Sequence, residues 1–173
     1  VLENEDVTPN NPTGINSGFV KGDVDFKNVW FAYHKEDYVL KDINFSIAAG
    51  ETLAIVGHTG SGKTSIISLL NRLYPTNQGS IKIDGHKIEN YDLDFLRRRI
   101  AVVLQDVFLF SGSVLDNITL RNHEIDRSQA IEAAKMIGVH DFIMKLPGNY
   151  DFNVMERGST LSLGQRQLLS FIR

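Results

Sequence analysis

The sequence contains no cysteine and no apolar run long enough to cross a membrane. The first absence excludes disulfides and thiolate metal sites, and it fits a cytosolic compartment. The second leaves no candidate membrane span within these residues. The first six residues also lack the basic and apolar regions of a secretory signal. The formal net charge of −3 gives no general electrostatic attraction to nucleic acid.

Histidine and basic clusters are equally sparse. The five histidines are scattered without the spacing of metal ligands, so we propose no zinc site. The only basic run, Arg97–Arg99, has carboxylates nearby and no interleaved aromatic residues, which favours a solvated helix end over a nucleic-acid contact. What remains is an ordinary soluble composition, 42% hydrophobic over 173 residues, sufficient for one domain with a real core.

The strongest motif is the stretch Gly57–Thr64, which reads GHTGSGKT and matches the phosphate-loop pattern GxxxxGK[ST]. The apolar run at 52–56 predicts a buried parallel strand before it, and the apolar periodicity at 66–73 predicts a helix after it. The glycines let backbone N–H groups point inward, where the helix also presents its positive end. Lys63 can reach the outer phosphates, and Thr64 has the hydroxyl that a phosphate-bound Mg²⁺ needs.

Other segments place this motif within the chain. Residues 1–22 are rich in proline, asparagine, glycine and acids, which predicts a linker; any missing part would then lie upstream. Residues 23–33 and 38–48 show the partial alternation of half-buried strands. Residues 100–104 predict a second buried parallel strand, which ends at Gln105. We therefore expect Gln105 at the same sheet edge as the phosphate loop, where it could position Mg²⁺ or water.

The last third of the chain is helical in pattern. Residues 126–137 predict a helix with a capping pair at its start and a glycine stop, and 139–146 predict a shorter one. These helices interrupt the strand–helix alternation, which indicates a helical subdomain inserted in an α/β core. Leu161–Gln165 reads LSLGQ, whose serine and glutamine form an ordinary capping box. The same helix start is also a potential anion site.

Three of these features together resemble a known family. The phosphate loop, Gln105 within VVLQDVFLFSGSVLDNI, and LSLGQRQ resemble, in order and spacing, the nucleotide-binding domain of ATP-binding-cassette (ABC) transporters. More narrowly, they resemble the exporter type, in which this domain follows a membrane domain. The resemblance covers Val24–Arg173 and implies a P-loop NTPase core with an N-terminal antiparallel β subdomain and an inserted helical subdomain, incomplete at its C-terminus. It makes 23–173 a partial ATP-binding domain and 1–22 a linker from a membrane domain.

The resemblance also implies the ligands, ATP and Mg²⁺. Tyr33 would stack on adenine, while Thr64 and Gln105 would hold the metal. Lys63 and Gln105 would take part in hydrolysis. The residues implied to contact the nucleotide are Tyr33, Gly57, His58, Thr59, Gly60, Ser61, Gly62, Lys63, Thr64 and Ser65.

Partners follow from the same resemblance. Two such domains, identical or different, would pair head to tail, and the signature segment of one would contact the γ-phosphate bound by the other. The residues implied in this contact are Ser162, Leu163, Gly164 and Gln165. Gln105 and the loop Met155–Gly158 would contact coupling helices of the membrane domain. The resemblance implies the cytoplasmic face of a membrane, with a bacterial inner membrane as the expected setting, and no nucleic-acid partner.

Two departures from the family pattern affect these expectations. The signature usually reads LSGGQ, and Leu163 replaces its middle glycine, so we expect the backbone to approach phosphate less freely. The Walker B aspartate, the catalytic glutamate, the D-loop and the switch histidine have no counterpart in these 173 residues. We therefore expect ATP hydrolysis in a longer parent and little in these residues alone. We also expect marginal stability, with exposed apolar faces where strand neighbours are lacking.

Two alternatives to an exporter motor stay open at this point. One is a non-hydrolysing or regulatory half-site that holds ATP and scaffolds a dimer, which Leu163 would suit. The other is a soluble P-loop ATPase of the chromosome-maintenance type. That class would carry a coiled coil between phosphate loop and signature, and the sequence shows no long heptad run there.

Overall fold

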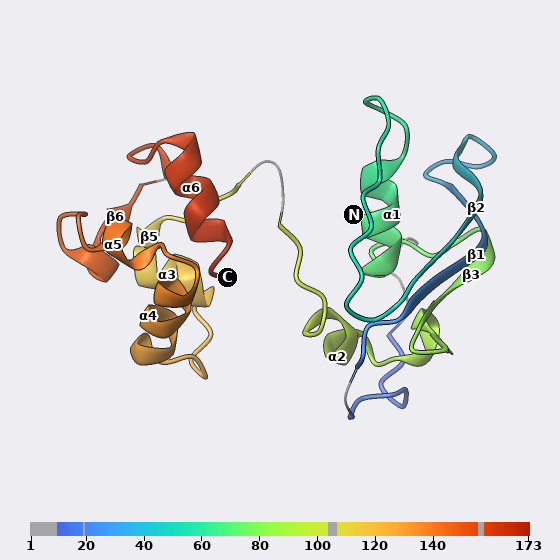
Figure 1. Cartoon of the computed structure of the whole chain (residues 1–173), viewed down its shortest axis with the longest axis horizontal. Helices are drawn as coiled ribbons and strands as arrows, with labels where there is room; N and C mark the ends of the chain where they lie inside the picture. The colour runs from blue at the N-terminus through green and yellow to red at the C-terminus, as the bar shows by residue number, and fades with distance from the viewer. Residues whose placement is uncertain (1–9, 19, 104–106, 156–157) are drawn as a thin grey trace, which may run out of the picture. The chain divides into compact units, whose positions relative to one another are not determined.

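The structure, a computed structural model, describes residues 10–18, 20–103, 107–155 and 158–173. It contains two compact units, Val1–Ala101 and Val102–Arg173, and each is described here by itself (Figure 1). Among the described residues, no helix is long and apolar enough to span a bilayer.

The first unit is built on a four-stranded antiparallel sheet, in the order β2-β1-β3-β4. Its strands are β1 (Val24–Ala32), β2 (Tyr38–Ile47), β3 (Gln78–Ile83) and β4 (His86–Lys87). Val24 in the central strand pairs with Ile47 on one side and with Ile83 on the other. The antiparallel β subdomain and its first two strands are therefore confirmed.

A bulge at Asn28 keeps the buried face of β1 continuous. Asn28 has a φ of 46°, and its N–H donates to Asn44 Oδ1 at 2.8 Å. The extra residue changes the spacing of the inward side chains, so that Phe26 and Val29, three positions apart, are both buried. Strict alternation would have turned one of them to solvent.

Helix α1 packs against this sheet (Figure 1). The helices of the unit are α1 (Lys63–Leu70), the 3₁₀ turn η1 (Ile88–Asn90) and α2 (Leu93–Arg97). Ile66 and Leu69 of α1 join Phe26, Val29 and Ile81 in one buried cluster. The packing fixes the start of α1, and with it the phosphate loop, relative to the sheet.

The segment before β1 is attached to the same unit. Ile15 forms a bridge with Tyr91 and packs on the core. The carboxylate of Asp84 accepts hydrogen bonds at 2.8–3.0 Å from the N–H groups of Lys21, Gly22 and Asp23. The assignment of 1–22 as an interdomain linker stays a prediction.

The two predicted parallel strands are wrong for this structure. Residues 52–56 and 100–103 have no strand hydrogen bonding, and position 104 lies outside the described residues. Leu53 and Val56 are 45% and 89% exposed, and Val103 is 54% exposed. A strand requires a neighbour to pair with its N–H and C=O groups, and no described strand pairs with either segment. Apolar composition alone cannot supply that neighbour, and the exposed apolar side chains are those expected of an unpaired run.

The second unit is helical, as expected. Its elements are β5 (Gly112–Ser113), α3 (Val114–Thr119), α4 (Arg127–Met136), α5 (His140–Ile143), the 3₁₀ turn η2 (Asn149–Asp151), β6 (Asn153–Val154) and α6 (Leu163–Ser170). The capping box Asp126–Gln129 starts α4, and Gly138 (φ 73°) follows its end, as predicted. Leu169 of α6 packs with residues of α3 and α4 in one buried cluster.

Candidate functional site

The phosphate loop closes onto α1 through two glycines in the left-handed region. Gly60 and Gly62 both have a φ of 85°, which L side chains rarely adopt. Gly62 is also crowded, because a Cβ there would lie 2.6 Å from Leu40 Cδ2 and 3.1 Å from Val39 Cγ1. At Gly60 a Cβ would meet nothing within 4 Å, so only the backbone conformation requires glycine.

Lys63 directs its charge into this bend. Its Nζ donates to the carbonyl oxygens of Gly57 at 2.8 Å and His58 at 2.7 Å, and it lies 3.4 Å from Ser61 Oγ. Among the described residues, no carboxylate lies within salt-bridge distance of Lys63. The loop therefore holds an ammonium group that no described acidic side chain neutralises, which suits an anionic ligand.

The start of α1 also suits an anion. The N-cap residue is Gly62, no side-chain cap bonds the first turn, and that turn contains no acidic residue. The first N–H groups of a helix have no partner within the helix, and the helix dipole makes their surroundings positive. The backbone N–H groups and the Lys63 ammonium thus form a donor set that fits a polyphosphate.

The donor set for a metal is much smaller. Thr64 is exposed at the helix start and offers one hydroxyl. Among the described residues, no group of three His, Cys, Asp or Glu side chains could hold an ion. A Mg²⁺ ion here would therefore depend on phosphate oxygens together with Thr64, which fits the magnesium chemistry of phosphate loops. Gln105, the second predicted metal residue, lies outside the described residues.

Tyr33 and the phosphate-loop helix meet directly. Tyr33 follows the end of β1, and its hydroxyl lies 3.0 Å from Ser65 Oγ in the first turn of α1. Its ring also makes edge contacts with Phe31, at 4.7 Å between centroids, and with Tyr74, at 5.1 Å. The structure thus brings Tyr33, Lys63, Thr64 and Ser65 to one region of the first unit. Sequence reasoning missed Tyr74, whose only signal is an aromatic residue soon after the helix.

The signature segment begins helix α6 in the second unit. Ser162 Oγ accepts from the N–H of Gln165 at 3.3 Å, and Gln165 Oε1 accepts from the N–H of Ser162 at 2.8 Å. The capping box is therefore confirmed. Leu163 is 58% exposed, and a Cβ at Gly164 would meet nothing within 4 Å. The φ of Gly164 lies outside the left-handed region, so neither backbone conformation nor packing in this unit demands glycine there.

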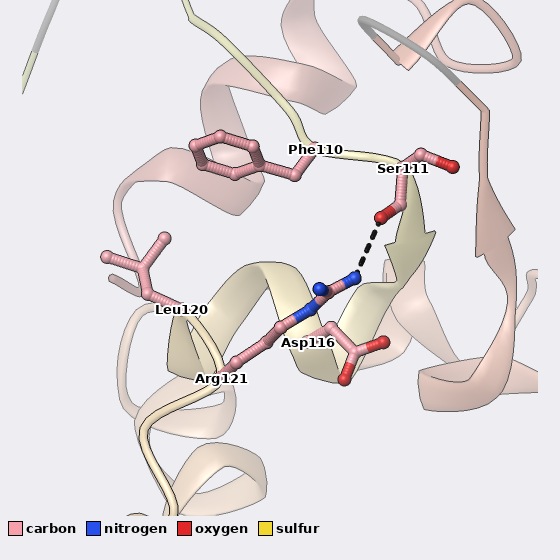
Figure 2. A pocket seen from close by; sticks show the side chains of 5 residues that line it. All are labelled: Phe110, Ser111, Asp116, Leu120 and Arg121. Carbon is pink, nitrogen blue, oxygen red and sulfur yellow. Dashed lines mark hydrogen bonds between the residues drawn. The ribbon is translucent and has the colours of Figure 1, made fainter.

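A separate hollow lies in the second unit, and its first lining residue follows Gln105 closely in the sequence (Figure 2). Its volume is about 480 Å³, and it is lined by Phe110, Ser111, Asp116, Leu120 and Arg121. Arg121 donates to the carbonyl of Ser111 at 3.2 Å, while the Phe110 and Leu120 side chains remain more than half exposed. Hydrogen bonds from Ser113 lower the pKa of the Asp116 carboxyl. The hollow thus combines apolar walls with a carboxylate and a guanidinium. The sequence analysis did not identify it.

The predicted loop Met155–Gly158 is only partly described. Glu156 and Arg157 lie outside the described residues, and Met155 is 54% exposed. Gly158 is buried, and a Cβ there would lie 2.7 Å from Arg166 Cδ of α6 and 2.9 Å from Leu109 Cδ1. The end of this loop therefore packs closely against α6.

The sheet, the glycine-rich bend and the uncapped lysine-bearing helix define the first unit as a P-loop nucleotide-binding unit. The sequence profile of the family described as ABC transporter matches residues 40–173. The chain belongs to this family, and it is similar to the ATP-binding domains of its exporters.

Relatives and a solved structure agree with this assignment. An uncharacterized ABC transporter ATP-binding protein, YknV of Bacillus subtilis, is 43% identical over all of this chain and 29% of its own length. The alpha-hemolysin translocation ATP-binding protein HlyB of Escherichia coli O157:H7 is 44% identical over 89% of this chain and 22% of its own. A bacterial Atm1-family ABC exporter solved with ATP bound is 35% identical with a TM-score of 0.88, covering 95% of this chain and 29% of that one.

This chain thus spans less than a third of the length of these three proteins. Other relatives are named as an ATP-dependent lipid A-core flippase and as multidrug export proteins. These names favour the exporter interpretation over the non-hydrolysing alternative, and the ABC ATPase fold class is confirmed.

Proposed function

We propose that this domain is the motor of an ABC exporter, in which binding and hydrolysis of ATP drive the transport of a substrate across a membrane. The observation that carries the proposal is the start of α1. There a helix start without a side-chain cap, two left-handed glycines and the Lys63 ammonium, which pairs with no described carboxylate, converge. This arrangement provides both the positive charge and the N–H donors that a triphosphate needs.

Within the proposed site, each residue has a separate task. Lys63 would leave the loop carbonyls to bind the outer phosphates, and Thr64 would share Mg²⁺ with the phosphate oxygens. The metal, when bound, offsets the charge that develops on the transferred phosphoryl group. Gln105 would position the metal or the attacking water. Tyr33, 42% exposed, would offer its ring to adenine.

We propose that the complete site forms between two copies of the domain paired head to tail, with the signature of one facing the phosphates of the other. Gly164 supports this assignment, because the fold of its own unit does not require glycine there. The partner domain could be identical or different. Leu163 and Gly164 are both exposed, so the signature segment is accessible from outside its own unit.

The hollow at Phe110 and Leu120 is the surface that we assign to the membrane domain, together with Gln105 and Met155–Gly158. Exposed apolar side chains beside a carboxylate and a guanidinium suit a short amphipathic helix. This contact would hold the domain at the cytoplasmic face of a membrane.

We expect the 173 residues alone to hydrolyse ATP far more slowly than the intact protein.

The experiment that tests the proposal is binding of a fluorescent ATP analogue to the Lys63→Ala variant. Binding should weaken at least about tenfold, because the variant loses charge-assisted hydrogen bonds to phosphate. Lys41→Ala, which removes an exposed lysine of β2, is the matched control and should bind like the wild type. Unchanged binding by the Lys63 variant would remove the phosphate-loop assignment.

A further inference from the structure

A hydrogen bond connects Tyr33 with the phosphate-loop helix α1. Tyr33 comes from the end of β1, whereas Ser65 belongs to the first turn of the phosphate-loop helix, 32 residues further along the chain. The Ser65 side chain is 4% exposed, while Tyr33 is 42% exposed. The hydrogen bond at 3.0 Å therefore joins a buried hydroxyl near the phosphate loop to the tip of an accessible ring.

A bond through the phenol oxygen fixes the ring without occupying its faces. The donor and acceptor directions of a phenol lie near the ring plane, so this bond itself covers neither face of the ring. Phe31 and Tyr74 add edge contacts at interplanar angles of 78° and 89°. Tyr33 is thus held by two neighbouring rings and by one hydroxyl, of which only the hydroxyl belongs to the phosphate-loop helix.

We propose that Ser65 is a positioning residue: through its hydroxyl it holds the Tyr33 ring at a fixed place relative to the phosphate loop. The inference rests on the proposed function, because it concerns how the nucleobase is bound at that site. Ser65 shares the first turn of α1 with Lys63 and Thr64. The residue that binds the base and the helix that binds the phosphates are then joined by a hydrogen bond. Tyr33 therefore loses less conformational freedom when the base binds.

Ser65 could act in a different way, by giving its hydroxyl to a phosphate oxygen. The two roles predict different losses of ligand affinity when the Ser65 hydroxyl is removed. A contact between Ser65 and phosphate would strengthen the binding of every triphosphate, whereas a positioned Tyr33 would strengthen the binding only of ligands that carry a base. A comparison between ATP and inorganic tripolyphosphate therefore separates them.

The test is a double-mutant cycle of Ser65→Ala and Tyr33→Phe in the intact protein, with affinities for ATP and for tripolyphosphate measured by calorimetry. Each single variant should weaken ATP binding about three- to tenfold, the effect of one lost hydrogen bond. The double variant should lose no more than either single one. Tripolyphosphate affinity should stay within about twofold, the usual error of such cycles. Ser65→Thr, which keeps the hydroxyl, should restore ATP binding.

Ser68→Ala, one turn further along α1, should bind both ligands like the wild type. Tyr33→Phe keeps the ring and tests the inference even if Ser65→Ala does not fold. Equal weakening of ATP and tripolyphosphate by Ser65→Ala, or wild-type ATP binding by Tyr33→Phe, would overturn the inference. Failure of the wild type to bind either ligand would instead refute the proposed function.

Discussion

The starts of α1 and α6 differ in how their first N–H groups are satisfied. Both helices have eight residues, and both carry a motif that the family resemblance assigns to ATP. Helix α1 follows Gly62, which has no side chain to bond the first turn. Helix α6 follows Ser162, whose hydroxyl and partner Gln165 close a capping box. One helix start leaves its donors for a ligand, and the other satisfies donors from its own sequence.

The difference bears on the order of events at the proposed site. A phosphate reaching α1 meets donors that no side chain has bonded. A phosphate reaching α6 competes with Ser162 and Gln165 for the same N–H groups. We infer that α1 is the primary site for the triphosphate and that α6 adds its contact only once a partner domain holds it in place.

The largest expected effect concerns the glycine before α1. Gly62→Ala should lower the free energy of unfolding by about 2–4 kcal/mol, since it combines left-handed strain with overlap on Leu40. Gly60→Ala is the matched control, because its φ is the same but its surroundings are open; it should cost about 1–2 kcal/mol. Urea unfolding measures both. Equal losses would mean that the sheet does not constrain this start.

A smaller effect of opposite sign is expected in α6. Gly164→Ala should raise the free energy of unfolding by up to about 1 kcal/mol, because alanine favours the helix and its Cβ meets no atom within 4 Å. The same change should lower the ATPase rate of the intact protein, because in the proposed head-to-tail pairing a methyl group would then face the other domain's phosphates. Thermal unfolding and phosphate release measure the two quantities.

The neighbouring cap provides the control for that variant. Ser162→Ala removes the hydroxyl that accepts from Gln165, and it should lower stability by about 1 kcal/mol. A gain in both stability and ATPase rate for Gly164→Ala would contradict the assignment of this glycine to ligand contact.

Local chemistry made much of the fold predictable. Alternation identified β1 and β2, and acid–glutamine spacing identified the start of α4. The glycine spacing of the phosphate loop predicted the helix at Lys63. Each of these signals lies within about ten residues, the range over which propensity and capping act.

The features that the sequence did not predict correctly depend on residues that lie far apart in the chain. An apolar run at 52–56 indicates burial, but a parallel strand exists only if other strands flank it. The Tyr33–Ser65 bond joins positions 32 residues apart, and neither side chain signals the other in the sequence. The hollow at Phe110 and Leu120 is lined by residues just before α3, in it and just after it, an arrangement that no spacing rule describes.

The smallest expected effect is a difference between a charged and a neutral helix cap in how their contribution to stability depends on pH. Asp126 caps α4, and hydrogen bonds from Ser128 and then Gln129 lower the pKa of its carboxyl. Because the folded-state pKa lies below the unfolded value of about 3.9, this cap stabilises the fold fully above that value. The stabilisation is lost as the pH falls from there through the folded-state pKa. Ser162, which caps α6 with a neutral hydroxyl, has no such dependence.

The comparison is made with Asp126→Asn, which keeps a capping side chain but does not titrate. Between pH 6 and pH 3 the wild type should lose more stability in urea than this variant, since the other carboxylates are common to both proteins. Ser162→Ala should instead differ from the wild type by the same amount at both pH values. If Asp126→Asn behaved in the same way as Ser162→Ala, the ionised carboxylate would not be what stabilises the start of α4, and the distinction between the two caps would fail.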